Sequence, residues 1–378
     1  MKYVLIPDSF KGTLSSAEIC TIAAEEILAL DSGAEICAIP VADGGEGTVD
    51  AFLAAAGGRR VALRCCGPQG REVDGFYGLL PDGTAVVEMA AAAGLPLMGE
   101  RKNAETATTY GVGQLIAHAL HGGARRIVLG LGGSATNDGG TGAAAALGVE
   151  FLNADGRPFV PVGKTLSDIA RIRMDGVDPA VLQVPFVTMC DIDNPLCGEN
   201  GASAVFGPQK GADAAMVARL DAGLAHLAEV VSRDLGVEIR ELPGSGAAGG
   251  FGGGSAAFFG STLQMGIETV LELVDFDRRC AGAGLILTGE GRLDHQSLRG
   301  KTVIGVARRA KALGIPAAAL VGAAVPAELE EAYRQGICGV FPIHPAPAAP
   351  ESVLPCSAAH LRFAVRNLVR FVKAIHTP

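Results

Sequence analysis

The stretch KYVLIPDSFKGTLSSAEICTIAAEEILAL (residues 2–30) indicates the fold class of this chain of 378 residues. It opens with a short apolar run that ends at Pro7 and Asp8, which is the pattern of a buried strand. A helix is predicted next, because Ser15 and Glu18 have the spacing of a capping box and apolar residues then recur along one helical face. A strand followed by a helix is the unit from which α/β proteins are built.

The same alternation of strands and helices occurs elsewhere in the chain. Further strands are predicted at residues 34–41, 284–289, 315–322 and 339–343, and helices at residues 46–58, 302–313 and 357–375, with another near Glu328. Strands that alternate with helices favour a parallel sheet. The pattern between the two chain ends is less regular. We therefore predict a discontinuous domain formed by residues 1–75 and 285–378, into which an α/β domain, residues 76–284, is inserted.

The composition excludes several classes of function. The formal charge is −9 and charges of one sign do not cluster, so we expect no nucleic-acid partner. The nine cysteines lack the spacing of zinc ligands and indicate small buried side chains in a reducing compartment. The apolar start is too short for a signal peptide, and no apolar run reaches membrane-spanning length. We expect a cytoplasmic protein without membrane contact.

Two stretches are rich in glycine. GLGGSATNDGGTG (130–142) follows an apolar run and combines six glycines with hydroxyl and amide side chains, which suits a loop that holds an anion. It lacks the lysine of a P-loop, so any positive charge must come from another segment. The alternative is an ordinary turn between a strand and a helix. In PGSGAAGGFGGGSAAFFG (243–260), interleaved phenylalanines favour an ordered, packed loop over a flexible linker.

Several carboxylates directly follow apolar runs. They are Asp8, Asp43, Asp191, Glu290 and Asp294. Ligands of open α/β sheets bind beyond the carboxyl ends of the strands, so acids at these positions are expected to converge on a crevice. The alternative for each acid taken alone is a helix cap or a turn residue.

Three lysines accompany these acids: Lys11, Lys210 and Lys301. Carboxylates and lysines together suit phosphoryl transfer, because the carboxylates hold Mg²⁺ or orient a hydroxyl and the lysines neutralise charge on the phosphoryl group. A dehydrogenase is disfavoured, since no convincing dinucleotide fingerprint is present, and no nucleophile elbow indicates a serine hydrolase. These features favour a nucleotide-dependent kinase.

Seven motifs are spread over most of the chain. They are PDSFKGTLSS (7–16), PVADGGEGT (40–48), ATTYGVGQLI (107–116), GLGGSATNDGG (130–140), CDIDNPLCGENGAS (190–203), FGPQKGA (206–212) and TGEGRLDHQSLRGK (288–301). Together they resemble the bacterial glycerate kinases that act in glyoxylate and sugar-acid catabolism. The resemblance implies phosphorylation of D-glycerate by ATP with Mg²⁺, usually at the 2-hydroxyl to give 2-phosphoglycerate. It also implies two α/β domains, one Rossmann-like and built from both chain ends, with the active site in the cleft between them.

The resemblance assigns candidate roles to residues of this sequence. The candidate catalytic residues are Asp8, Lys11, Asp191 and Asp294, and the candidate metal ligands are Asp191 and Glu290. The candidate substrate-binding residues are Ser9, Lys11, Asp43, Gly44 and Lys301. The candidate nucleotide-binding residues are Gly132, Gly133, Ser134, Thr136 and Asn137. Either Asp191 or Asp294 would accept the hydroxyl proton, and the other would position Mg²⁺. The loop 130–142 would hold either the ATP phosphates or the glycerate carboxylate.

Alternative functions stay open at this point. A kinase that forms 3-phosphoglycerate or acts on another small hydroxy acid would use the same residue types. A regulator that binds a nucleotide or an acid without turnover is a third possibility, although such a regulator needs no proton acceptor. The expected partners are small molecules only, and the chain is expected to be a monomer or a homodimer.

Overall fold

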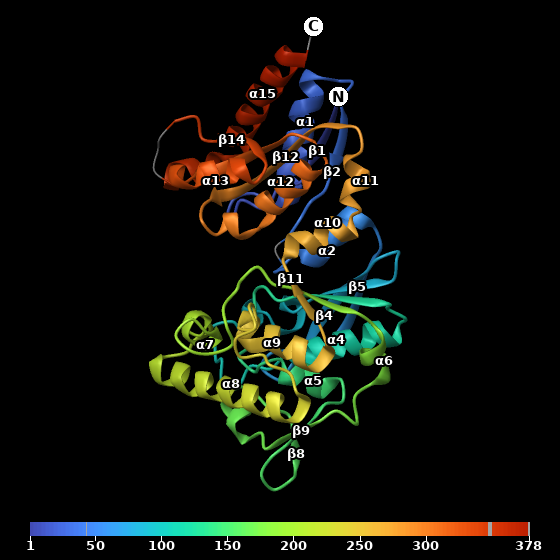
Figure 1. The fold of residues 1–378 in the computed structure, drawn as a ribbon, viewed down its shortest axis with the longest axis vertical. Helices are drawn as coiled ribbons and strands as arrows, with labels where there is room; N and C mark the ends of the chain where they lie inside the picture. Colours follow the sequence, from blue (N-terminus) through green and yellow to red (C-terminus); the bar gives the residue numbers. More distant parts are fainter. Residues whose placement is uncertain (43, 347–349, 377–378) are drawn as a thin grey trace. The chain divides into compact units, whose positions relative to one another are not determined.

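The computed structural model describes residues 1–42, 44–346 and 350–376 (Figure 1). The chain forms two compact units, of which the first comprises Met1–Asp43, Ala54–Ala56 and Met265–Pro378, and the second Gly44–Leu53 and Gly57–Gln264. Each unit contains a sheet with parallel strands and helices packed against it, which confirms the predicted α/β class. Within the described residues, no helix is both long and apolar enough to cross a membrane.

The sheet of the first unit has five parallel strands in the order β2-β1-β12-β13-β14. Their bounds are β1 Lys2–Leu5, β2 Glu35–Ala38, β12 Ala283–Leu293, β13 Ala317–Ala324 and β14 Ile337–Pro342. The chain runs from β1 to one neighbour, β2, and later adds β12 on the other side of β1. The order of a doubly wound sheet therefore reverses between β1 and β12, and such a switch point is where open α/β sheets bind ligands.

Helices cover both faces of this sheet. They are α1 Ser16–Leu30, α10 Gly266–Leu273, α11 Phe276–Cys280, α12 Thr302–Ala312, α13 Leu329–Arg334, α14 Pro350–Val353 and α15 Ser357–His376. Leu320 of β13 packs in the core beneath α1 and α15, whereas its neighbour Val321 packs with α12 and α13. Successive residues of a strand point to opposite faces, so these two helix layers lie on opposite sides of the sheet. The last helix lies beside the first (Figure 1), where Arg362 pairs with Glu25.

The predicted capping box is confirmed at the start of α1. The Ser15 side chain accepts a hydrogen bond from the Glu18 N–H, and the Glu18 carboxylate accepts one from the Ser15 N–H. These bonds satisfy two of the N–H groups that have no partner inside the helix. The helix therefore begins where the sequence pattern predicts.

The sheet of the second unit has six strands in the order β11-β10-β6-β5-β4-β3. Their bounds are β3 Arg59–Cys66, β4 Glu72–Leu79, β5 Thr84–Glu88, β6 Arg126–Gly130, β10 Phe186–Met189 and β11 Thr262–Gln264. The strands β5, β6, β10 and β11 are parallel, while β3 and β4 form an antiparallel hairpin at one edge. A small antiparallel sheet consists of β7 Glu150–Leu152, β8 Pro158–Phe159 and β9 Arg171–Arg173.

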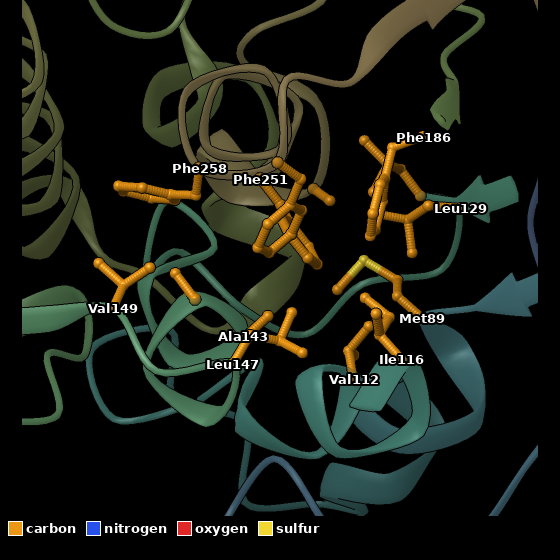
Figure 2. Close-up of a cluster of buried hydrophobic side chains, with 14 of the residues drawn as sticks. Met89, Val112, Ile116, Leu129, Ala143, Leu147, Val149, Phe186, Phe251 and Phe258 are labelled. Atoms are coloured by element: carbon orange, nitrogen blue, oxygen red, sulfur yellow. The ribbon is translucent and has the colours of Figure 1, made fainter. Parts of the chain in front are cut away.

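Helices of the second unit enclose a large apolar core. They are α3 Ala90–Ala93, α4 Tyr110–His121, α5 Thr141–Ala146, α6 Pro179–Gln183, α7 Ala202–Phe206, α8 Ala214–Leu235 and α9 Ala247–Phe259, and α2 Thr48–Ala56 links the two units along the chain. Figure 2 shows Phe251 and Phe258 of α9 in this core, near Ala143 and Leu147.

The unit boundaries differ from the predicted domain boundaries. Residues 44–53 and 57–75 were expected in the first domain but belong to the second unit. Within the second of these stretches, β3 pairs with β4 along its whole length. Residues 265–284 were expected in the inserted domain, yet Met265 and the residues after it belong to the first unit. There Ile267 of α10 packs so closely on Gly305 of α12 that a Cβ at Gly305 would lie 2.5 Å from its side chain.

The glycine-rich stretch 243–260 is helical rather than a loop over most of its length. Residues 248–250 are left-handed, and the regular part of α9 follows them. Phe251, Phe258 and Phe259 are buried, as their interleaving with glycine indicated. The glycines let α9 approach its neighbours closely, because a Cβ at Gly254 would lie 2.0 Å from the Gly139 carbonyl oxygen. Packing thus overrides the low helix propensity of glycine.

Candidate active site

Asp8 and Ser9 lie just beyond β1, at the switch point of the first sheet. The Asp8 N–H donates to the Gly289 carbonyl of β12 at 2.8 Å, which fixes the loop against that strand. The Asp8 carboxylate accepts a hydrogen bond from the Ser9 N–H at 2.6 Å and one from the Thr302 hydroxyl at 3.5 Å. Thr302 is the first residue of α12, so Asp8 lies near the positive end of that helix.

Glu290 lies on β12 beside these residues. Its Oε1 is buried and has no hydrogen-bond partner among the described residues. Burial raises the pKa of Glu290 to about 7, a hydrogen bond with Ser297 opposes this shift, and the carboxylates of Asp8 and Asp294 add to it. A buried carboxylate near two others, with one unsatisfied oxygen, is an environment that a cation would stabilise.

Asp294 and Lys301 follow β12 in the chain. Asp294 accepts a hydrogen bond from the Gln296 N–H at 2.9 Å, and the Lys301 ammonium donates to the Gln296 side chain at 3.2 Å. The Lys301 charge acts on Glu290 and lowers its pKa, which places the lysine near the carboxylates. Lys11 is exposed in the loop after β1. The first unit thus brings most of its predicted catalytic and substrate-binding residues to one end of its sheet.

Asp43 lies outside the described residues, whereas Gly44 belongs to the second unit. The Gly132 N–H donates to the Gly44 carbonyl at 2.9 Å, and a Cβ at Gly132 would lie 2.4 Å from the Gly45 Cα. Gly44, which was expected beside the substrate, therefore contacts a residue that was expected beside the nucleotide. Only glycine permits this approach of two backbone segments.

Only part of the loop 130–142 is open to solvent. Gly133 is exposed and Gly132 partly so, while Ser134 is 9% exposed and the residues after it are buried. Thr136 and Asn137 are fully buried, and Asn137 donates to the Ser203 hydroxyl at 3.1 Å. A ligand approaching from solvent meets the glycines and Ser134 first, whereas Thr136 and Asn137 support the loop from inside.

Lys210 supplies the positive charge that this loop lacks. Its side chain is buried, and its Nζ donates to the Ser134 hydroxyl at 2.8 Å and to the Thr136 carbonyl at 2.7 Å. Burial lowers the pKa of Lys210 to about 7, and the charge of Asp138 opposes this shift. The prediction that a lysine from another segment reaches the loop is confirmed.

Asp138 holds the loop in shape. It is fully buried, and its carboxylate accepts hydrogen bonds from the Thr109 N–H and hydroxyl, each at 2.8 Å, and from the Gly140 N–H at 3.1 Å. Burial raises the pKa of Asp138, and these hydrogen bonds oppose the shift. The bonds tie the loop to the start of α4, because Thr109 immediately precedes that helix.

Asp191 follows β10 at the same sheet end as this loop, because Met189 of β10 pairs with Gly130 of β6. Asp191 and Glu290, the two predicted metal ligands, belong to different units. Across residues 1–42, 44–346 and 350–376, no group of three or more histidine, cysteine, aspartate or glutamate side chains has the arrangement of a metal site.

Glu88 is a further carboxylate of this region that the sequence analysis did not select. It ends β5, is buried, and accepts a hydrogen bond from the Val49 N–H at the start of α2 at 2.9 Å. Burial raises its pKa, and the backbone hydrogen bonds oppose the shift. Glu88 has the same sequence feature as the five selected acids, because it directly follows a strand-like run, TAVV (84–87).

Comparison with known proteins adds independent findings. A sequence model described as "Glycerate kinase family" matches residues 3–373. The chain is 41% identical over 379 residues to the glycerate kinase of Bacillus subtilis (strain 168), an alignment that covers 100% of this chain and 99% of the relative. It is 41% identical over 345 residues to the glycerate 2-kinase of Escherichia coli (strain K12), covering 91% and 90%.

A solved structure agrees with this result. The crystal structure described as glycerate kinase 2 from Salmonella typhimurium LT2 superimposes with a TM-score of 0.87 at 40% sequence identity, and the match covers 99% of this chain and 98% of the other. The family model and the relatives span nearly the whole chain, and both units are therefore part of the match. The chain belongs to the glycerate kinase family, and it is a kinase.

Proposed function

We propose that this kinase transfers the γ-phosphoryl group of ATP to the 2-hydroxyl of D-glycerate and releases 2-phosphoglycerate and ADP. The observation that carries the proposal is the similarity over 91% of the chain to a protein named glycerate 2-kinase. The carboxylates and the lysine at the switch point of the first sheet support it, because phosphoryl transfer requires a proton acceptor and positive charge near the transferred group.

The first unit is proposed to bind D-glycerate. Ser9 and Lys11 would hold the carboxylate or the transferring phosphoryl group, and Lys301 would add a second positive charge. Asp294 or Asp191 would accept the proton of the attacking hydroxyl. In this scheme, Asp43 and Gly44 complete the binding of the substrate. The scheme includes the expectation that substrates bound to the two units meet in a shared cleft.

The loop 130–142 of the second unit is proposed to bind the ATP phosphates. Gly132, Gly133 and Ser134 form its accessible part, and the buried Thr136 and Asn137 would maintain its shape. Phosphate binding at this position is supported by the buried ammonium of Lys210 beneath Ser134. The alternative, in which this loop holds the glycerate carboxylate, uses the same donors.

Mg²⁺ is proposed as the cofactor, with Asp191 and Glu290 as its ligands. The unsatisfied buried oxygen of Glu290 fits a cation, and Mg²⁺ in kinases is commonly bound by one or two carboxylates together with substrate phosphates. When bound, the ion would neutralise charge on the phosphates. A cytoplasmic location and a monomeric or homodimeric state stay predictions.

The proposal is tested by measuring ADP release with ATP, Mg²⁺ and each member of a panel of hydroxy acids. Activity with D-glycerate well above that with L-glycerate and sugar acids supports it, and preference for another acid contradicts the substrate assignment. ATP binding without turnover of any acid would indicate the regulator. Asp155→Asn, which changes an exposed turn residue, serves as the control.

Two variants assign the base. Asp294→Asn and Asp191→Asn are compared, because a positioned acid-base group contributes about 100-fold or more to kcat. The variant of the base is expected to lose about that factor, while the ADP yield of the other is restored in part by higher Mg²⁺. A loss of less than about tenfold in kcat removes a residue from the role of base.

A further inference from the structure

The hydrogen bond between Lys210 and Ser134 has a fixed direction when Lys210 is protonated, as it is below its pKa of about 7. The ammonium group then carries no lone pair, so Lys210 Nζ donates and the Ser134 oxygen accepts at 2.8 Å. The hydroxyl hydrogen of Ser134 therefore points away from Lys210. Across the described part of the chain, no acceptor is found for this hydrogen.

Ser134 lies next to the accessible glycines in the loop. Ser134 is 9% exposed and directly follows Gly133, which is exposed and has φ +73°. On its other side, the backbone is held, since the Ala135 N–H donates to the Ala93 carbonyl at 2.9 Å. The loop thus has one hydroxyl beside two glycines that allow a ligand to approach the backbone.

Lys210 is itself held firmly. It is 2% exposed and donates a second hydrogen bond to the Thr136 carbonyl at 2.7 Å, so its ammonium lies beneath the loop rather than in solvent. The charge of Asp138 acts on it, and the Asp138 carboxylate also accepts hydrogen bonds from Thr109 and Gly140.

We propose that Ser134 is a hydrogen-bond donor to an anionic oxygen, a phosphate or a carboxylate oxygen, bound at Gly132 and Gly133, and that Lys210 is the positioning residue that orients the Ser134 hydroxyl. This inference rests on the proposed function for the identity of its two possible ligands, ATP and D-glycerate. Lys210 acts through Ser134 and does not contact the ligand.

The test measures binding of each ligand by titration calorimetry on the full chain, with ATP and D-glycerate titrated separately. Ser134→Ala removes the donor, and Ser134→Thr keeps a hydroxyl. We expect Ser134→Ala to weaken one ligand about tenfold or more, as for other hydrogen bonds to charged groups, and to leave the other within about twofold. Weaker binding of ATP would identify the acceptor of the Ser134 hydrogen bond as a phosphate oxygen, and weaker binding of D-glycerate would identify it as a carboxylate oxygen. Unchanged binding of both ligands overturns the proposal.

Lys210→Met tests the positioning role. It is expected to weaken the same ligand, and the double variant Ser134→Ala with Lys210→Met is expected to bind that ligand as Ser134→Ala does, because Lys210 acts through the hydroxyl. If the losses of affinity in the two single variants multiply in the double variant, Lys210 does not act through the Ser134 hydroxyl. In steady state, the KM for the affected ligand should rise while kcat is retained, a separation that general destabilisation would not give.

Two controls keep the outcome interpretable. Ser32→Ala changes an exposed serine of the first unit and should bind both ligands as the unmodified chain does. If Lys210→Met fails to fold, Ser134→Ala and Ser134→Thr still decide the donor role, and Lys210→Leu, which also lacks a donor, takes the place of Lys210→Met in the cycle. Calorimetry needs no turnover, so a chain that binds ATP without forming 2-phosphoglycerate would contradict the proposed function and still test this inference.

Discussion

Replacing Asp138 by asparagine is expected to destabilise the second unit strongly. In the asparagine variant, the amide oxygen can replace Oδ2 and keep both donors of Thr109, but the amide NH₂ then faces the Gly140 N–H. The unsatisfied Gly140 N–H costs about 1–3 kcal/mol, and each Thr109 bond weakens by about 1 kcal/mol when its acceptor loses its charge. The expected loss in free energy of unfolding is about 3–5 kcal/mol.

The loss is measured by differential scanning calorimetry, because the chain contains no tryptophan to report unfolding by fluorescence. A unit of this size loses roughly 2–4 °C in Tm per kcal/mol, so the transition of the second unit should move down by roughly 6–20 °C. Asp155→Asn, at an exposed turn, should move it by less than about 2 °C. A shift for Asp138→Asn as small as that of the control would refute the role of Asp138 in holding the loop.

Three further predictions concern other parts of the fold. Glu26→Gln should lower the free energy of unfolding of the first unit by about 1–2 kcal/mol and lower its Tm accordingly. The buried Glu26 carboxylate accepts hydrogen bonds from two arginines of α15 that are themselves partly exposed. An unchanged thermal transition in circular dichroism would contradict this prediction. Gly249→Ala places a Cβ 2.0 Å from the Thr136 carbonyl oxygen at φ +68°, whereas Gly156→Ala places one in open space at φ +75°. The Gly156 variant is expected to lose about 1–2 kcal/mol in free energy of unfolding, and the Gly249 variant is expected to lose more. Equal losses in urea unfolding would argue against close packing at Gly249. Between pH 7 and 9, the unfolded chain binds more protons at Lys210 than the folded chain does, because the pKa of Lys210 is lowered in the folded chain. The free energy of unfolding therefore rises with pH by up to about 1.4 kcal/mol per pH unit, and Lys210→Met should remove that rise. Parallel profiles of Tm against pH for the two chains would show that Lys210 is not the titrating group.

Much of the fold could be predicted from local patterns. The first strand and helix follow from an apolar run and from the capping box of Ser15 and Glu18, whose hydrogen bonds are local in sequence. The unit boundary near residue 44 could not be predicted in this way. It depends on the pairing of β3 with β4 and on their place at the edge of the second sheet, and this pairing is a contact between segments rather than a property of either one.

The candidate site was predictable to a similar extent. Acids that end apolar runs indicated Asp8, Glu290 and Asp294, because the carboxyl ends of parallel strands meet at one edge of a sheet. An ordinary turn was the alternative for the loop that contains Asp138, and the buried hydrogen bonds of Asp138 to Thr109 could not be predicted. They depend on α4 and the loop 130–142 coming together in three dimensions.

The central claim is phosphorylation of glycerate at its 2-hydroxyl, and phosphorus NMR of the reaction product tests it most directly. The purified chain is incubated with ATP, Mg²⁺ and D-glycerate, and the proton-coupled phosphorus spectrum is recorded. A new phosphomonoester signal that is split into a doublet by the single proton on carbon 2 is predicted. A triplet from the two protons on carbon 3 would identify 3-phosphoglycerate and contradict the proposed position of transfer. A spectrum in which only ATP remains would contradict the proposed reaction.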